Sequence, residues 1–228
     1  WMERVKIVVD WFISSGLYVI LNTHHDNANY SEKPIKYGRG YFPLAKDMEE
    51  SEKFLYNVWK QISIAFNDGY DEHLIFELLN EPHDSYHPEH KFWEQPNCAT
   101  CAENMKLLNK YNQIIVDVIR DSKGNNLKRF IACPGLMANP EYTMWDLFKI
   151  PQDKEKGKLI IAVHMYDPYN FAGESPGIKT FTKNMGSQIA VTFKKLNEKF
   201  IKNPYKADEI IYNTGDLAKW LPNGELIC

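Results

Sequence analysis

A glutamate beside an amide, at the end of a short apolar segment, is the strongest chemical signal in the sequence. Residues 73–79 read His-Leu-Ile-Phe-Glu-Leu-Leu, and Asn80, Glu81 and Pro82 follow directly. So short an apolar run is typical of a strand buried on both faces of a parallel sheet, and proline has no N–H with which to continue the ladder. Parallel α/β folds place their chemistry at the carboxyl ends of the strands. We therefore expect Glu81 to act as a general acid or base in a cleft, rather than as a solvated loop carboxylate.

Two other apolar segments also end in polar side chains. The residues concerned are His24, His25 and Asp26 at the end of 17–26, and His164 and Tyr166 at the end of 158–166. On a strand, side chains two positions apart point the same way, and adjacent ones point to opposite faces. His24 and His25 therefore cannot both bind one metal ion while the strand continues. Hydrogen bonding to a hydroxylated ligand is favoured, and no metal site is predicted. Each of these side chains alone is more typical of a core, but three such strand ends form a candidate site.

The segments that must position these residues alternate between strand and helix patterns. We expect strands over 17–26, 73–82, 129–134 and 158–166, and helices over 1–15, 49–67, 104–122, 185–201 and briefly within 141–149. This alternation, with long loops after the strands, favours a parallel (β/α)8 barrel over an open sheet. No glycine-rich phosphate loop follows any expected strand, which argues against nucleotide binding. Because a whole barrel needs eight strands, the predicted fold class is α/β, an incomplete (β/α)8 TIM barrel.

The composition is ordinary for a globular protein and argues against several classes of partner. Of the 228 residues, 44% are hydrophobic and 25% are charged, enough for one large domain with a substantial core. The formal net charge of −3 gives no reason to expect nucleic acid or an anionic membrane as a partner. Aromatic residues, 14% of the chain, suit stacking on sugar rings but equally suit a core. A helix pattern is already present at Trp1, so we expect the natural N-terminus upstream and draw nothing from the lack of a signal peptide.

Four cysteines leave the redox state open: Cys98, Cys101, Cys133 and Cys228. The spacing of Cys98 and Cys101 suits half of a zinc site, but the sequence has no second pair. A loop disulfide and two free thiols are both compatible with this spacing. No cofactor is predicted.

Together, the three strand ends resemble family 5 of the glycoside hydrolases, the large family that contains many cellulases. The motifs are Val19-Ile20-Leu21-Asn22-Thr23-His24-His25-Asp26, Phe76-Glu77-Leu78-Leu79-Asn80-Glu81-Pro82 and Val163-His164-Met165-Tyr166, with support from 1–5 and 111–120. The His-His-Asp form is most similar to the endoglucanase branch known from anaerobic rumen fungi and clostridia. The resemblance extends from residue 1 to about residue 202.

The resemblance implies a retaining endo-β-1,4-glucanase that acts outside the cell on β-glucan polysaccharide or oligosaccharide. By this likeness Glu81 is the acid/base, and Asn80 holds the sugar 2-hydroxyl. The side chains that line the cleft are then His24, His25, His164 and Tyr166. Tyr166 also supports the nucleophile. Retention proceeds through a covalent glycosyl-enzyme, which requires two carboxyl groups about 5–5.5 Å apart.

The sequence departs from the family pattern where catalysis is concerned. The family's nucleophile is a Glu at the end of strand seven in a Gly-Glu-Phe/Trp-Gly context, and no such motif occurs in the sequence. Counterparts of the first two barrel strands and of the last strand are also absent from it. We therefore expect hydrolysis by this chain to be impaired. A non-catalytic glycan-binding barrel is the alternative function.

Residues 203–228 differ in kind from the rest of the sequence. Residues 212–225, which include Asp216, resemble part of the adenylation domains of nonribosomal peptide synthetases, in which that Asp holds the ATP ribose. The stretch is too short to fold or to bind ATP by itself, so an adenylate-forming enzyme ranks last among the functions. We expect a partial barrel domain over 1–202 and a foreign tail over 203–228. Alternatively, 209–212 forms a makeshift seventh strand that places Asn213 where the nucleophile belongs.

Overall fold

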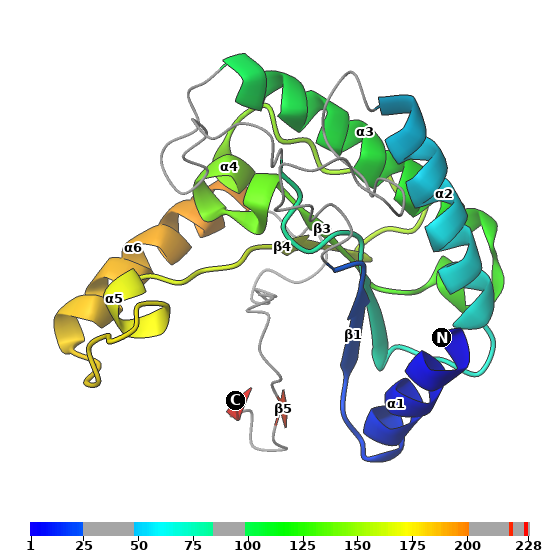
Figure 1. The fold of residues 1–228 in the computed structure, drawn as a ribbon, viewed down its shortest axis with the longest axis horizontal. Helices are drawn as coiled ribbons and strands as arrows, with labels where there is room; N and C mark the ends of the chain where they lie inside the picture. The colour runs from blue at the N-terminus through cyan, green and yellow to red at the C-terminus, as the bar shows by residue number, and fades with distance from the viewer. Residues whose placement is uncertain (25–47, 84–98, 201–218, 221–225, 228) are drawn as a thin grey trace.

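A parallel sheet of four strands organises the molecule. The computed structural model describes residues 1–24, 48–83, 99–200, 219–220 and 226–227. The strands are β1 (Val19–Asn22), β2 (Leu74–Glu77), β3 (Ile131–Pro134) and β4 (Leu159–Ala162). They lie in the order β1-β2-β3-β4, and all three pairings are parallel (Figure 1). Each new strand is added beside the previous one, as in a barrel, whereas a doubly wound sheet reverses direction at its first strand.

Helices connect the strands. They are α1 (Met2–Ser14), α2 (Met48–Ala65), α3 (Ala99–Asp121), α4 (Pro140–Met144), α5 (Tyr169–Ala172) and α6 (Lys183–Phe200). The two longest connections, α2 and α3, pack against each other on the same side of the sheet (Figure 1). Helix α3 begins five residues before the predicted start at 104, because its first turn is helical but lacks the apolar periodicity on which the prediction rested. Gly16, just after α1, has φ +77° and ends the helix as predicted.

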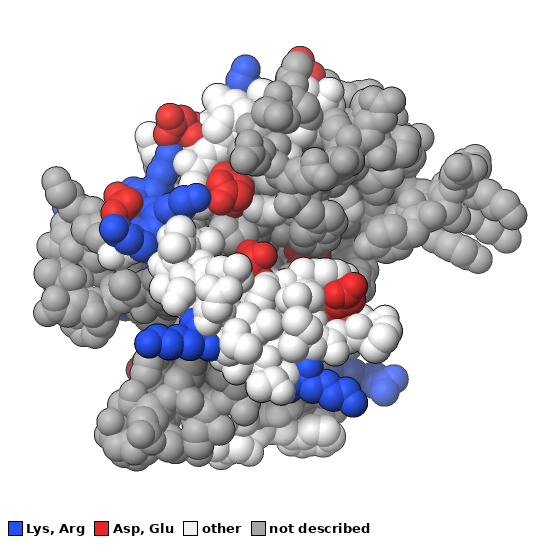
Figure 2. Space-filling view, turned by 90° about the vertical axis from the view of Figure 1, so that its left-hand side faces the viewer, with Lys and Arg blue, Asp and Glu red and all other residues white. Residues whose placement is uncertain are grey.

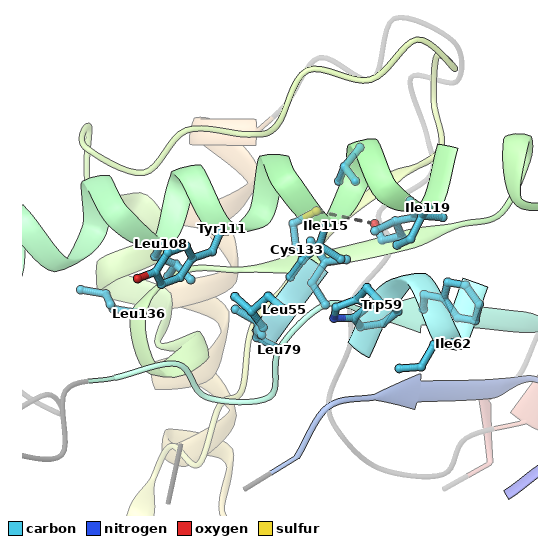
Figure 3. Close-up of a cluster of buried hydrophobic side chains, with 14 of the residues drawn as sticks. Leu55, Trp59, Ile62, Leu79, Leu108, Tyr111, Ile115, Ile119, Cys133 and Leu136 are labelled. Carbon is cyan, nitrogen blue, oxygen red and sulfur yellow. Dashed lines mark hydrogen bonds between the residues drawn. The ribbon is translucent and has the colours of Figure 1, made fainter. Parts of the chain in front are cut away.

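The main core lies between the sheet and helices α2 and α3. Alternate residues of β2, Leu74 and Phe76, face these helices, and the Phe76 ring centroid lies 5.5 Å from that of Trp59. Figure 3 shows Leu55, Trp59 and Ile62 from α2 opposite Leu108, Tyr111, Ile115 and Ile119 from α3. A second, smaller cluster, made of Ala132, Ile160 and Ala162 with Ile75 and Phe130, lies on the other face of the sheet. We call this other face, turned away from α2 and α3, the inner face.

A buried arginine network holds the amino end of the sheet together. Arg129 is 1% exposed and precedes β3. Its guanidinium donates to five acceptors at 2.7–3.1 Å, namely the Asn126 side chain and the backbone carbonyls of Phe66, Tyr70, Asp71 and Leu74. Burial lowers the pKa of Arg129 to about 10, still well above neutral pH, so the guanidinium remains charged. The network therefore fixes where β2 and β3 begin.

The described surface carries mixed charge. Figure 2 shows acidic and basic side chains interspersed on one face of the molecule. Lys195 lies 3.8 Å from Glu141, and Lys199 lies 2.5 Å from Asp146, so cations of α6 pair with anions at or near α4. Within the described residues, no helix is long and apolar enough to cross a membrane.

The structure bears on the predictions made for the cysteines and for the tail, residues 203–228. Cys101 is disulfide-bonded, so it is not a free thiol. Cys98 and Cys228 both lie outside the described residues, and the bonding partner of Cys101 is therefore outside them too. Cys133 is free and buried, and burial raises its pKa. In the tail, β5 (Lys219–Trp220) and β6 (Leu226–Ile227) pair antiparallel as a sheet of their own. The strand predicted over 209–212 lies outside the described residues.

Candidate active site

The carboxyl ends of β1, β2 and β3 are tied together by hydrogen bonds beyond the last ladder pairs. The hydroxyl of Thr23 donates to the carbonyl of Leu78 at 2.8 Å, and the N–H of Asn80 donates to the carbonyl of Thr23 at 3.1 Å. On the other side, the N–H of Leu78 donates to the carbonyl of Ala132 at 3.0 Å. Strand β2 ends at Glu77, before the predicted end at 82, but these bonds hold the chain in place as far as Asn80. Glu81 is therefore presented at the carboxyl edge of the sheet, as predicted.

Glu81 is partly exposed and held from two sides. Its side chain is 23% exposed, and its Oε1 lies 2.8 Å from Nδ1 of His164. The Nδ1 of His83 lies 2.6 Å from the backbone carbonyl of Glu81. The next carbonyl, that of Pro82, accepts from the N–H of Met137 at 2.9 Å, in the short helix η3 (Leu136–Ala138). The carboxyl is thus fixed at one oxygen, and its side chain stays partly exposed.

His164 is a buried cation between two carboxylates. Its side chain is 8% exposed, and its backbone N–H donates to the carbonyl of Ala138 at 2.8 Å. Its Nε2 lies 3.6 Å from Oε1 of Glu77, an ion-pair distance, while Nδ1 contacts Glu81. Burial by itself lowers the pKa of His164, but Glu77 and Glu81 raise it by more, to about 9. At neutral pH both ring nitrogens therefore carry protons.

Glu77 is a residue of the site that sequence reasoning missed. It is 3% exposed, and its Oε2 accepts from the side-chain amide of Asn22 at 2.8 Å. In the sheet, Asn22 pairs with Glu77, and Glu77 pairs with Ala132, so the carboxylate belongs to the inner face, opposite to that of Phe76. The signal was a charged residue inside a segment predicted to be buried on both faces. A charge there needs a partner of opposite sign.

The remaining predicted residues lie at or beyond this edge. Asn80 is half-buried. His24 is exposed just after β1. Tyr166 is 48% exposed, although His164 two residues earlier is buried; β4 ends at Ala162, so strand alternation no longer governs either side chain. His25 lies outside the described residues.

The arrangement is suited to moving a proton at one carboxyl group. A carboxyl that is anchored at one oxygen and accessible at the other can give a proton to a bound molecule and later accept one. Among the residues that the structure describes, no group of three or more His, Cys, Asp or Glu side chains is placed to hold a metal ion.

Comparison with known proteins identifies the protein family of this chain, with its parallel sheet and its polar residues at the carboxyl edge. Residues 1–208 match the family model described as Cellulase (glycosyl hydrolase family 5). The chain is 35% identical over 201 residues to endoglucanase B of Ruminococcus albus, which covers 88% of this chain, and 41% identical over 173 residues to endoglucanase A of Clostridium longisporum, which covers 75% of it. The chain belongs to glycosyl hydrolase family 5.

A solved structure supports the fold. A family 5 lichenase from Caldicellulosiruptor, a mutant in complex with cellotetraose, superposes with a TM-score of 0.76 at 36% identity, over 88% of this chain and 53% of that one. The four-stranded sheet is therefore part of a (β/α)8 barrel, which confirms the predicted fold class. The chain spans 44% and 29% of the lengths of the two relatives above. None of these three likenesses involves a peptide synthetase.

Proposed function

We propose that this chain is part of a retaining endo-β-1,4-glucanase that acts on β-glucan, with Glu81 as its acid/base. The observation that carries the proposal is the anchored, 23% exposed carboxyl of Glu81 at the carboxyl edge of a barrel sheet, in contact with buried His164. Asn80, the preceding residue, is half-buried at the same edge and in this proposal binds the sugar 2-hydroxyl. His24, His25 and Tyr166 line the cleft in this proposal, together with His164.

In the proposed reaction of the whole enzyme, Glu81 protonates the glycosidic oxygen as the bond from that oxygen to the anomeric carbon breaks. The anomeric carbon bonds at the same time to the family's carboxylate nucleophile, whose motif this sequence lacks. Its Oε1 is occupied by the N–H of His164, so Oε2 faces the leaving group. As Glu81 becomes a carboxylate, the adjacent imidazolium stabilises the developing negative charge. In the second step the same carboxylate takes a proton from water, whose oxygen bonds to the anomeric carbon as the bond between that carbon and the nucleophile breaks.

We further propose that the 228 residues alone hydrolyse glucan slowly, because the sequence contains no Glu in the Gly-Glu-Phe/Trp-Gly context of the family's nucleophile. Glu77 cannot replace it. Glu77 is 3% exposed and bound by Asn22, and the His164 ring lies between its carboxylate and that of Glu81. No sugar fits between the two carboxylates while the imidazole is there.

Azide rescue with an aryl β-cellobioside tests both statements. Azide replaces the missing carboxylate: its nitrogen bonds to the anomeric carbon, the bond to the aglycone breaks, and Glu81 gives its proton to the aglycone oxygen. We expect little aryl alcohol release without azide, and azide-dependent release together with α-cellobiosyl azide. Glu81→Gln should suppress this release from a phenyl glycoside, and Glu72→Gln, a change at an exposed glutamate just before β2, should not.

The outcomes separate the two statements. Hydrolysis without azide at rates usual for the family overturns the proposal of impaired turnover, and leaves the glucanase proposal in place. Absence of azide-dependent release, together with absence of cellotetraose binding by calorimetry, overturns the glucanase proposal. Binding of cellotetraose without azide rescue favours the alternative, a non-catalytic glycan-binding barrel.

Three further statements belong to the same proposal. The chain falls in the branch known from anaerobic fungi and clostridia, supported by the 41% identity to the Clostridium longisporum enzyme. Its partner is β-glucan, encountered outside the cell. Residues 1–202 form the barrel domain, and 203–228 are a foreign tail without an ATP-binding function of their own. Sequencing an independent transcript across the codon for residue 203 tests the last point, because an uninterrupted barrel sequence there would overturn it.

A further inference from the structure

The inner face of the sheet carries three titratable groups in a line, which we call the Glu77–His164–Glu81 line. Glu77 and Glu81 both come from the β2 segment, four residues apart, and contact opposite nitrogens of one imidazole. The imidazole comes from the segment after β4, two strands away in the sheet. Family resemblance accounted for Glu81 and His164 and gave Glu77 no role.

Glu77 is held in place for its contact with His164. Its Oε2 accepts from the side-chain amide of Asn22 at 2.8 Å, and its Oε1 lies 3.6 Å from Nε2 of His164. Ala132, with its small side chain, is the residue of β3 that pairs with Glu77. Ala162 is the last residue of β4 and precedes His164 by two positions. Because both alanines on the inner face are small, the imidazole has room between the two carboxylates.

The protonation of His164 determines where the proton of Glu81 can be. With both ring nitrogens protonated, Nδ1–H donates to Oε1 of Glu81, so an acidic proton on Glu81 must be on Oε2, the oxygen left for the substrate. If His164 were neutral with its proton on Nε2, Nδ1 would be an acceptor. Glu81 would then place its proton on Oε1 and donate it to His164, away from the leaving group.

We propose that Glu77 is a positioning residue, which through His164 keeps Nδ1 a hydrogen-bond donor and so directs the proton of Glu81 toward the leaving group. The proposal rests on the proposed function for its consequence in catalysis, but its structural part stands alone. The charged groups that face His164 among the described residues are Glu77, the last residue of β2, and Glu81, four residues after it. From η3 it meets the neutral carbonyl of Ala138, and from β1 the amide of Asn22 reaches it only through Glu77. These two carboxylates are also the groups that raise the pKa of His164.

Nitrogen-15 NMR of the histidine rings tests the structural part without any turnover. In the unaltered chain at neutral pH we expect His164 as a doubly protonated imidazolium with a titration midpoint near 9. In Glu77→Gln, which keeps an acceptor for Asn22, the midpoint should fall toward the ordinary histidine value, and in Glu72→Gln it should not move. A neutral His164 at neutral pH in the unaltered chain overturns the proposal, even if no variant folds.

Leaving-group dependence tests the catalytic part. In azide-driven cleavage, a phenyl β-cellobioside needs a proton from Glu81, whereas a dinitrophenyl β-cellobioside does not. Glu77→Gln should slow the phenyl substrate by roughly 10- to 100-fold, within the range of general acid catalysis, and the dinitrophenyl substrate by about twofold or less. Glu77→Asp should recover part of the phenyl rate.

The two failures are distinguishable. Equal slowing of both substrates shows a merely structural role for Glu77 and overturns the catalytic part of the proposal. If the unaltered chain cleaves neither substrate with azide, the proposed function fails instead, and the NMR titration alone decides whether Glu77 controls the protonation of His164.

Discussion

The Nδ1 atom of His164 lies 2.8 Å from Oε1 of Glu81, although the two residues are 83 positions apart in the sequence. The contact links the segment after β4 to the segment after β2, across the end of β3. It joins a side chain that is 8% exposed to one that is 23% exposed, so a buried cation supports a carboxyl at the surface. The stability of this edge should therefore depend on the charge of His164.

Stability should fall as pH rises from about 6.5 to 9. The pKa of His164 is raised in the folded chain from 6.5 to about 9, so the folded state binds its proton more tightly than the unfolded state does. The stabilisation is fully present below 6.5 and is lost as pH rises through 9, amounting to about 2–3 kcal/mol in the free energy of unfolding. Urea denaturation across this range measures it.

The matched variants for this prediction are two histidine substitutions. His164→Gln should flatten the pH dependence, whereas His73→Gln should leave it, because the pair of His73 with Asp71 is far more exposed. An unchanged slope in His164→Gln would contradict the assignment of the effect to the Glu77–His164–Glu81 line.

Tyr166→Ala should weaken cellotetraose binding about fivefold, because Tyr166 is 48% exposed near the carboxyl edge of the sheet and offers an aromatic face worth roughly 1 kcal/mol to a sugar. Tyr18→Ala is the control, since Tyr18 is 50% exposed but lies before β1, at the amino end of the sheet, stacked on His73. Isothermal calorimetry compares the two. Equal affinities for both variants would remove Tyr166 from the proposed cleft.

Arg129→Lys should lower the free energy of unfolding by about 3 kcal/mol, because an ammonium donates at most three hydrogen bonds and cannot reproduce the planar fork that satisfies five acceptors. Arg4→Lys, at an exposed position on α1, should change it by less than about 0.5 kcal/mol. Chemical denaturation measures both. A loss below about 1 kcal/mol for Arg129→Lys would mean that the carbonyls find other donors.

Ile20→Thr should reduce self-association of the chain. Ile20 is 43% exposed in β1, and among the described strands β1 pairs only with β2, so we expect another chain to pair at its other edge. Ile64→Thr is the control, because Ile64 is 68% exposed but lies on α2. Light scattering over time follows the effect, and equal aggregation of the two variants would exclude the β1 edge as its cause.

Several features of the fold follow from local sequence alone. The apolar run ending in Asn80-Glu81-Pro82 marks a buried strand and a polar end, and alternation with helical segments predicts a parallel sheet. The predicted boundaries of these elements were less accurate. Helix α3 begins at Ala99, although the sequence there has no apolar periodicity, and β2 ends at Glu77 because its ladder pairing stops there, before Pro82 is reached. Both are differences that a single segment cannot reveal, since each depends on what packs beside it.

The sequence by itself determined which apolar segments form strands and that polar residues follow them, because burial periodicity and the lack of a proline N–H are properties of adjacent residues. Only the tertiary structure decided that His164 lies between Glu77 and Glu81, and that Asn22 holds the buried one. These contacts depend on the register of β1 on β2 and on the size of the alanines on the inner face. Glu77, an acid within an apolar strand, is explained only by its contact with His164, which comes from the segment after β4. Sequence periodicity carries no information on the distance between these two side chains.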